Sequence, residues 1–331
     1  MTSTATLPAA VATPRLYRGQ RIALIVPCYN EEAAIAEVIR GFRAQLPELS
    51  ICVFDNNSTD RTAQIARDEG AMVVQVQLSG KGNVVRRMFA DIEADIYVMT
   101  DGDATYDAST CTAMVDKLLD ERLDMVVACR KTEASIAADA YRRGHQLGNQ
   151  VLTGGVGSIF GGAFTDMLSG YRAFSRRFAK SFPALSRGFE IETELTVHAL
   201  ELRMPYGEID TSYFARPEGS QSKLSTYKDG FRILRTILRL YVSERPMHCF
   251  GLLALVCALI SVGLAIPILQ EFWRDGLVPR LPTAVLCASI MILTMLSLVC
   301  GVILDSITRG RQEMKRLTYL SVERTKVNSD V

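Results

Sequence analysis

Two apolar segments near the C-terminal end constrain this chain most strongly. Residues Phe250–Leu269 and Leu281–Leu304 contain no charged side chain, and each is long enough to cross the ~30 Å hydrocarbon core of a bilayer as a helix. Buried core helices of a soluble protein are the alternative, but two such segments side by side favour a membrane hairpin. The sequence therefore predicts two transmembrane helices within residues 247–305.

The charges around the two segments predict the orientation of the hairpin. The flanking basic residues are Lys228, Arg232, Arg235, Arg239 and Arg245 before the first segment, and Arg309, Arg311, Lys315, Arg316, Arg324 and Lys326 after the second. In the link 270–280, two arginines are offset by two carboxylates. Because basic flanks stay on the cytosolic side, we expect both termini in the cytosol. Trp273 and Phe272 would then anchor the outer interface.

Composition excludes several other classes of protein. The 37 basic and 36 acidic residues nearly cancel, so no nucleic-acid partner is indicated. The eight cysteines form no Cys-x-x-Cys pair, which argues for reduced thiols and against a zinc site or a disulfide framework. Residues 1–20 lack the basic start and apolar run of a signal peptide, and we interpret them as a disordered tail.

From Arg21 onward, short apolar runs alternate with helical segments. Strands are expected at 22–26, 51–54, 72–76, 96–99 and 125–128, and helices at about 31–46, 61–69, 83–94 and 110–122. This alternation predicts an α/β domain, residues 21–228, with a mostly parallel sheet covered by helices on both faces. In such sheets, ligands bind beyond the carboxyl ends of the strands.

Three polar clusters follow predicted strands, at Pro27–Glu32, Asp55–Asp60 and Asp101–Asp107. Turn chemistry accounts for any one of them, but together they should meet at one edge of the sheet. Asp101 and Asp103 could bind a hard divalent cation, Mg²⁺ or Mn²⁺, with substrate phosphates completing its shell. Asp107, just before the predicted helix 110–122, is interpreted as a loop or capping residue.

Basic amphipathic segments adjoin the predicted hairpin on both sides. Residues 229–246 place arginines between leucines and isoleucines, and residues 306–331 are similarly basic. Such helices lie on anionic headgroups. We therefore expect the α/β domain to be held against the lipid bilayer.

Seven motifs occur in a defined order along the chain. They are "VPCYNEE" (26–32), "DNNSTD" (55–60), "GKGN" (80–83), "DGD" (101–103), "LSGYRAFSRR" (168–177), "GFEIETEL" (188–195) and "GSQSKLSTYKDGFRI" (219–233). Together they resemble the family 2 glycosyltransferases of GT-A fold, a Rossmann-like fold with a mostly parallel sheet. The branch they most resemble is the polyprenyl-phosphate glycosyltransferases, which include dolichol-phosphate mannosyltransferase and the bactoprenol glucosyltransferases. The resemblance covers about residues 20–325, including a two-helix membrane anchor.

This resemblance implies an integral membrane enzyme, expected in the bacterial inner membrane. It would transfer a hexose with inversion from UDP-glucose, UDP-GlcNAc or GDP-mannose to undecaprenyl or dolichyl phosphate at the cytosolic face. Another membrane lipid or a glycan as acceptor, and a catalytically inert scaffold that kept the fold, are the alternatives. A homo-oligomer is left open.

The resemblance also assigns residues to the site. Donor-binding roles are implied for Pro27, Tyr29, Glu31, Glu32, Asp55, Lys81, Asp101 and Lys223. Acceptor-phosphate roles are implied for Arg130, Arg142 (or Arg143), Ser169 and Arg172. Asp103, Asp101 and Arg172 would be catalytic, with Asp103 contacting the metal most directly. Many relatives carry Gln where Thr105 stands, which puts a metal-binding role for that position in doubt.

Some of these roles have alternatives. Lys81 could be a solvated lysine in a glycine-rich turn, and Glu190 and Glu192 could contact the sugar or brace their loop. No histidine falls within a motif. A sugar hydroxyl acceptor would need a general base, whereas a phosphate is already ionised near neutral pH. Asp166 is the reserve base if one is used.

Two other enzyme classes fit less well. A processive polysaccharide synthase carries a Gln-x-x-Arg-Trp motif, but the only tryptophan, Trp273, lies in the link between the apolar segments. A dinucleotide-binding dehydrogenase needs Gly-x-Gly-x-x-Gly, and in "GGVGSIFGG" Phe160 stands at the last glycine position.

Overall fold

A computed structural model describes residues 16–131, 164–186, 190–217 and 241–323, together with positions 154, 157, 161, 162, 188, 234, 235 and 238. The chain divides into two compact units. One comprises Met1–Leu234 with Lys315–Val331, and the other comprises Arg235–Met314. Arg142, Arg143, Lys223 and half of the predicted amphipathic segment 229–246 lie outside the described residues.

The first unit is built on a seven-stranded mixed sheet. Its strands are β1 (Ile22–Cys28), β2 (Ser50–Asp55), β3 (Met72–Gln75), β4 (Ile96–Met99), β5 (Met125–Lys131), β6 (Arg172–Ser175) and β7 (Tyr206–Ser212). Their order is β3-β2-β1-β4-β6-β5-β7. β6 runs antiparallel to β4 and β5, and all other neighbours are parallel. This confirms the predicted fold class.

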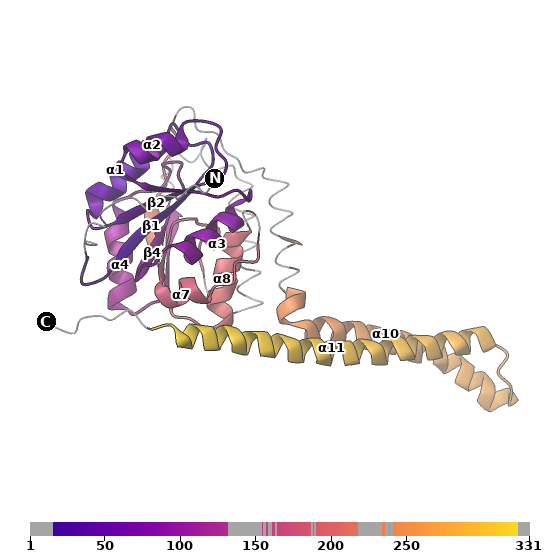
Figure 1. The fold of residues 1–331 in the computed structure, drawn as a ribbon. Helices are drawn as coiled ribbons and strands as arrows, with labels where there is room; N and C mark the ends of the chain where they lie inside the picture. Colours follow the sequence, from indigo (N-terminus) through magenta and orange to yellow (C-terminus); the bar gives the residue numbers. More distant parts are fainter. Residues whose placement is uncertain are drawn as a thin grey trace, which may run out of the picture. The chain divides into compact units, whose positions relative to one another are not determined.

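Helices cover both faces of the sheet (Figure 1). They are α1 (Ile35–Gln45), α2 (Thr62–Asp68), α3 (Lys81–Asp91), α4 (Thr110–Asp120), α7 (Arg176–Ser181) and α8 (Ile191–Glu201). α1, α2 and α4 pack on one face, and α3, α7 and α8 pack on the other. α1 shows why: Ile35, Val38, Ile39 and Phe42 are buried at helical spacing and form one apolar stripe.

Two strands and one short segment differ from the sequence prediction. The strand series was expected to close at 125–128, but β6 and β7 follow it. β7 has the sequence "YGEIDTS" and is only partly buried. It contains no apolar run that would predict a strand. Within the predicted tail, Tyr17 and Gln20 form a β-bridge, and the Tyr17 hydroxyl donates to Asp116 at 3.0 Å.

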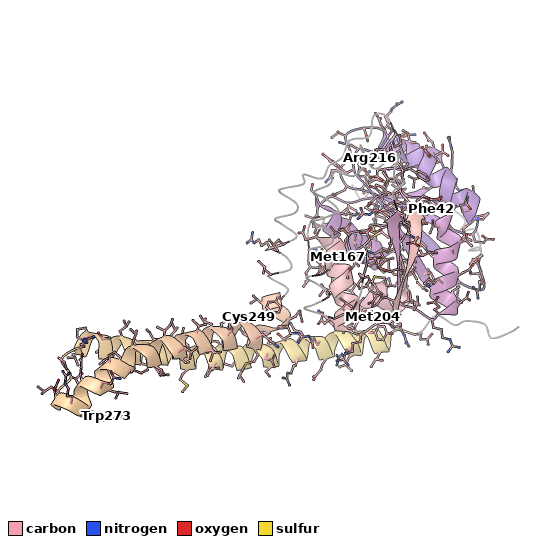
Figure 2. The ribbon with its side chains drawn as sticks, turned by 180° about the vertical axis from the view of Figure 1, so that it is seen from behind. Phe42, Met167, Met204, Arg216, Cys249 and Trp273 are labelled. Atoms are coloured by element: carbon pink, nitrogen blue, oxygen red, sulfur yellow. The ribbon has the colours of Figure 1, made fainter. Side chains whose placement is uncertain are left out.

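The second unit is a helical hairpin. It contains α10 (Pro246–Asp275) and most of α11 (Leu281–Ser321), both long and apolar enough to cross a membrane. Most of its buried residues recur every seven positions, namely Ala254, Ser261 and Ile268 on α10, and Cys287, Thr294, Gly301 and Thr308 on α11; Pro246 and Ser297 are buried outside this period. This spacing keeps one face of each helix, made mostly of small side chains, in the contact between the two helices. Trp273, near the end of α10, is 81% exposed (Figure 2).

The end of α11 belongs to the first unit, and this was not expected. The sequence suggested a separate basic segment after residue 305, whereas α11 continues to Ser321. Lys315 Nζ lies 2.7 Å from Glu201 Oε2 at the end of α8. The Tyr319 hydroxyl donates to Asp124 Oδ2 at 2.8 Å. These contacts attach the last turns of α11 to the α/β core.

Candidate functional site

The loops that follow β1, β2 and β4 are joined by direct contacts. The Asn56 amide donates to Cys28 O at 2.8 Å, and the Asn30 amide donates to Ser58 Oγ at 2.9 Å. Gly102 lies so close to the first loop that a Cβ there would stand 2.6 Å from Cys28 Sγ. The three polar clusters therefore meet at the carboxyl edge of the sheet.

Asp101 follows β4 and forms one part of a buried charge network. Lys81 Nζ, at the start of α3, lies 2.6 Å from Asp101 Oδ1 and 2.6 Å from Glu192 Oε1 of α8. Burial by itself lowers the pKa of Lys81, but Asp101 and Glu192 outweigh it and hold the pKa above its ordinary value. Lys81 is therefore a charged lysine between two carboxylates, and Glu192 braces this network.

Asp103 is 5% exposed and stands beside Asp101. Thr105 Oγ1 donates to Asp103 Oδ1 at 2.7 Å, so threonine at this position contacts the carboxylate directly. Arg216 Nη2 lies 2.6 Å from Asp103 Oδ2. Burial and the nearby Asp101 raise the pKa of Asp103, while Arg216 opposes the shift.

These residues fit a hard divalent cation. The carboxylates of Asp101 and Asp103 share one polar edge of the sheet. Burial and the charge of Asp101 disfavour the ionised form of Asp103, so an added positive charge would stabilise that form. Among the described residues, no group of three or more His, Cys, Asp or Glu could hold a metal. A cation at Asp101 and Asp103 would thus need phosphate oxygens or water to complete its shell, as Mg²⁺ and Mn²⁺ commonly do.

Arg216 is the site residue that sequence reasoning missed. It follows β7 and belongs to no recognised motif. The signal that could have identified it is its position, three residues before "GSQSKL". Only the fold shows that this position faces Asp103.

The predicted donor-base residues lie on the first two loops. Tyr29 is exposed, whereas Glu31 is buried and its amide donates to Thr62 Oγ1 at 2.8 Å. Glu32 Oε2 accepts from the Arg61 amide at 3.0 Å, which links the loops. Pro27 O lies 3.6 Å from the position a Cβ on Gly102 would take.

Asp55, at the end of β2, is the most suggestive of the donor-side residues. It is 2% exposed, and its Oδ1 has no hydrogen-bond partner within the part of the chain that the structure describes. A buried carboxylate oxygen without a partner is costly. A ligand hydroxyl or N–H at this edge would satisfy it.

On the other side of β4, Arg130 follows the buried part of β5. Its Nε and Nη2 donate to Asp166 Oδ2 and Oδ1, both at 2.7 Å. Its guanidinium lies 5.6 Å from the centre of the Tyr213 ring. Asp166, the reserve base of the sequence analysis, therefore orients an arginine here.

The structure places Ser169 and Arg172 in the core, and this corrects the expectation of direct phosphate contact. Arg172 is 0% exposed and donates to Ser169 O at 2.9 Å, to Thr196 Oγ1 at 3.0 Å and to Met167 O. Ser169 Oγ donates to Ala128 O at 2.6 Å. With their polar groups used internally, both residues shape the loop before β6.

Comparisons with known proteins agree with this geometry. A sequence profile described as Glycosyl transferase family 2 matches residues 23–179. The chain is 58% identical to an uncharacterised Shigella flexneri protein over 161 residues, 49% of this chain and 99% of that protein. It is 34% identical over 301 residues to the glycosyltransferase AglJ of Haloferax volcanii, 90% of this chain and 98% of that protein.

A dolichyl-phosphate hexose transferase of the same archaeon is 25% identical over 229 residues, 69% of this chain and 97% of that protein. Glucosyl-3-phosphoglycerate synthase of Mycobacterium tuberculosis, solved with Mn²⁺, UDP-glucose and phosphoglyceric acid, shares the fold. Its TM-score is 0.53 at 22% identity, covering 68% of this chain and 79% of that chain. The motif order, the sheet and these similarities place the chain in glycosyl transferase family 2, as a glycosyltransferase.

Proposed function

We propose that this glycosyltransferase moves one hexose from a nucleotide-diphosphate sugar to a polyprenyl phosphate, with inversion at the anomeric carbon. The observation that carries the proposal is the arrangement at one edge of the sheet. The paired carboxylates of Asp101 and Asp103 follow β4, and the Arg130 guanidinium lies two strands further along the sheet at β5.

The carboxylate side would take the donor. Asp103 and Asp101 would hold Mg²⁺ or Mn²⁺, which as a Lewis acid stabilises the charge on a departing nucleoside diphosphate. The mycobacterial enzyme of like fold was crystallised with Mn²⁺ and UDP-glucose, which supports this donor class. Asp55 Oδ1 would accept a hydrogen bond from the base or ribose, and the exposed Tyr29 ring would line the base.

The arginine side would take the acceptor. A phosphate monoester carries a charge of about −1.5 to −2 at pH 7, so it can attack without a general base. Arg130 presents a guanidinium whose geometry matches phosphate oxygens. Asp166 fixes this guanidinium through two hydrogen bonds. The attack on the anomeric carbon would be a single in-line displacement.

The helical hairpin supports a lipid acceptor. A polyprenyl phosphate stays in the bilayer, so an enzyme that uses it must work at the membrane surface. The basic residues flanking α10 and α11 favour a cytosolic location for the α/β unit and both termini. The similarity to a dolichyl-phosphate hexose transferase supports the same acceptor class.

The test is a reconstituted transfer reaction. The purified full chain in lipid nanodiscs is incubated with Mn²⁺ or Mg²⁺, undecaprenyl phosphate, and UDP-glucose, UDP-GlcNAc or GDP-mannose in turn. Glycolipid formation and nucleotide release are both measured. We expect glycolipid with at least one donor, and a loss of about 100-fold in Asp103→Asn because transition-state charge is no longer offset.

Asp107→Asn is the matched control. Asp107 Oδ1 accepts from the Ser109 amide at 2.9 Å just before α4, a role that an asparagine oxygen can also fill. This variant should keep full activity. Absence of glycolipid with every donor, or full activity in Asp103→Asn, would contradict the proposed function.

A further inference from the structure

Arg216 is held beside Asp103 by the backbone that precedes it. After β7, the Phe214 amide donates to Thr105 O at 2.8 Å, and Tyr213 forms a β-bridge with Tyr106. This short pairing fixes the segment against the loop that carries the carboxylates. The Arg216 side chain, labelled in Figure 2, is 25% exposed, whereas the side chain of Asp103 is 7% exposed.

Both oxygens of the Asp103 carboxylate are occupied. Oδ1 accepts from Thr105, and Oδ2 is paired with the Arg216 guanidinium. A buried carboxylate requires such a counter-charge, because leaving it unpaired is costly. A divalent cation at Asp103 would need one of these oxygens. Since Thr105 lies two residues away on the same loop, Arg216 is the partner that can leave.

Arg216 also stands where a second partner is expected. The guanidinium has five N–H donors in a planar fork that matches phosphate oxygens. A nucleoside diphosphate bound through a cation at Asp103 would come close to it. Arg216 is followed directly by Pro217, and the segment that contains Lys223 begins beyond.

We propose that Arg216 is a further residue of the donor site that serves in two positions. In the cation-free enzyme it neutralises Asp103, and on donor binding it transfers its guanidinium to the diphosphate. This inference rests on the proposed function. As a consequence, the effect of Arg216 on cation affinity changes sign. Arg216 weakens the binding of a cation alone and strengthens the binding of a cation together with the nucleotide.

A purely structural role would not give this sign change. If Arg216 only braced its loop, its removal would disorder the site and weaken both binding reactions. If Arg216 competes with the cation and then moves to the diphosphate, its removal should strengthen the binding of the cation alone and weaken the binding of the cation with the nucleotide. The two explanations are therefore separable by binding measurements that need no turnover.

The experiment measures Mn²⁺ binding to the full chain by electron paramagnetic resonance of the free ion, with and without UDP or GDP. In Arg216→Gln, we expect Mn²⁺ alone to bind about tenfold more tightly, because a charge-assisted contact no longer competes. Binding of the Mn²⁺–nucleotide complex should become about tenfold weaker. Arg216→Lys, which keeps the charge but not the fork, should fall between wild type and Arg216→Gln.

Arg18→Gln is the matched charge control. Arg18 pairs with Asp116 and Asp120 on the surface of α4, so its removal changes the net charge equally. It should leave both affinities at the wild-type value. Thermal unfolding with and without Mn²⁺ gives a second readout, in which Arg216→Gln should show the larger Mn²⁺-induced rise in Tm.

Two outcomes separate failure of this inference from failure of the proposed function. If Asp103→Asn binds Mn²⁺ as wild type does, the cation site itself is wrong. If Asp103→Asn loses Mn²⁺ but Arg216→Gln binds the ion alone equally or more weakly, only the two-position role of Arg216 is overturned.

Discussion

Gly170 lies against the carboxylate of Asp101 so closely that a Cβ at position 170 would stand 2.6 Å from Asp101 Oδ2. The carboxylate cannot simply turn away, because Lys81 holds its other oxygen at 2.6 Å. Gly170→Ala should therefore displace Asp101 and reduce turnover by at least about tenfold, with the fold retained. Steady-state kinetics together with circular dichroism would check this.

Gly41→Ala is the control for that substitution. A Cβ on Gly41, within α1, would lie at an ordinary 3.5 Å from Ala108 Cβ. Alanine also favours a helix by about 1 kcal/mol over glycine. This variant should keep full turnover and gain slightly in stability. Equal turnover in both alanine variants would show that Gly170 does not set the position of Asp101.

The network of Lys81 should contribute strongly to stability. Lys81→Met leaves the carboxylates of Asp101 and Glu192 without their shared cation, and this should lower the free energy of unfolding by about 3–5 kcal/mol. Adding Glu192→Gln should recover part of the loss, because one uncompensated charge is removed. Denaturant unfolding of the full chain would measure both variants.

Lys117→Met provides the comparison for this network. Lys117 pairs with Glu121 at helical spacing on the surface of α4, and such a pair contributes only about 0.5 kcal/mol. If Lys81→Met proved no more destabilising than Lys117→Met, the buried network would not be the stabilising element inferred above.

Arg130 and Arg172 should respond differently to replacement by lysine. Arg130→Lys loses the planar fork that would contact the acceptor phosphate, so KM for the lipid should rise about tenfold with KM for the donor unchanged. Arg172→Lys should mainly lower the unfolding midpoint, because its guanidinium holds buried carbonyls of Met167 and Ser169. A stable Arg172→Lys with a selective defect in lipid use would reverse this assignment.

His198 predicts how stability depends on pH. Burial, with a smaller contribution from Lys315, lowers the pKa of His198 to about 3. The ring lies against Phe178 and Phe182, and Ser181 Oγ is 3.2 Å from Nε2. Between about pH 6.5 and pH 3, His198 is therefore protonated in the unfolded chain but neutral in the folded chain.

Stability should therefore fall as the pH drops from about 6.5 towards 3, by up to about 1.4 kcal/mol per pH unit from this group. His198→Gln removes the titrating group and should flatten the dependence of Tm on pH between about 6.5 and 4.5, even if its overall Tm is lower. An unchanged slope would show that His198 does not control the acid response.

The sequence predicted the first five strands and the first four helices well, because each carries an apolar run or a helical stripe. The sequence analysis missed β6 and β7, each for its own reason. β6 is only four residues long and begins with an arginine, and β7 alternates without strong apolar character. Such strands form because the neighbouring β4 and β5 offer unpaired edges, which a local pattern does not reveal.

The meeting of the polar loops was predictable because each loop directly follows an apolar strand. Asp55, Asp101 and Asp103 were singled out in this way, and their roles at the site stay predictions. The role of Arg172 could not be, since "SGYR" reads the same whether the arginine points out or in. Arg216 required the sheet order itself, because its contact with Asp103 spans more than a hundred residues of chain.

The attachment of α11 to the α/β unit also sets an order of events during synthesis. Residues that complete this unit, including Lys315 and Tyr319, leave the ribosome only after both apolar helices have been made. Glu201 and Asp124 therefore cannot form these contacts until the two apolar helices have been synthesised. The last native contacts of the α/β unit can therefore form only after both apolar helices have been synthesised.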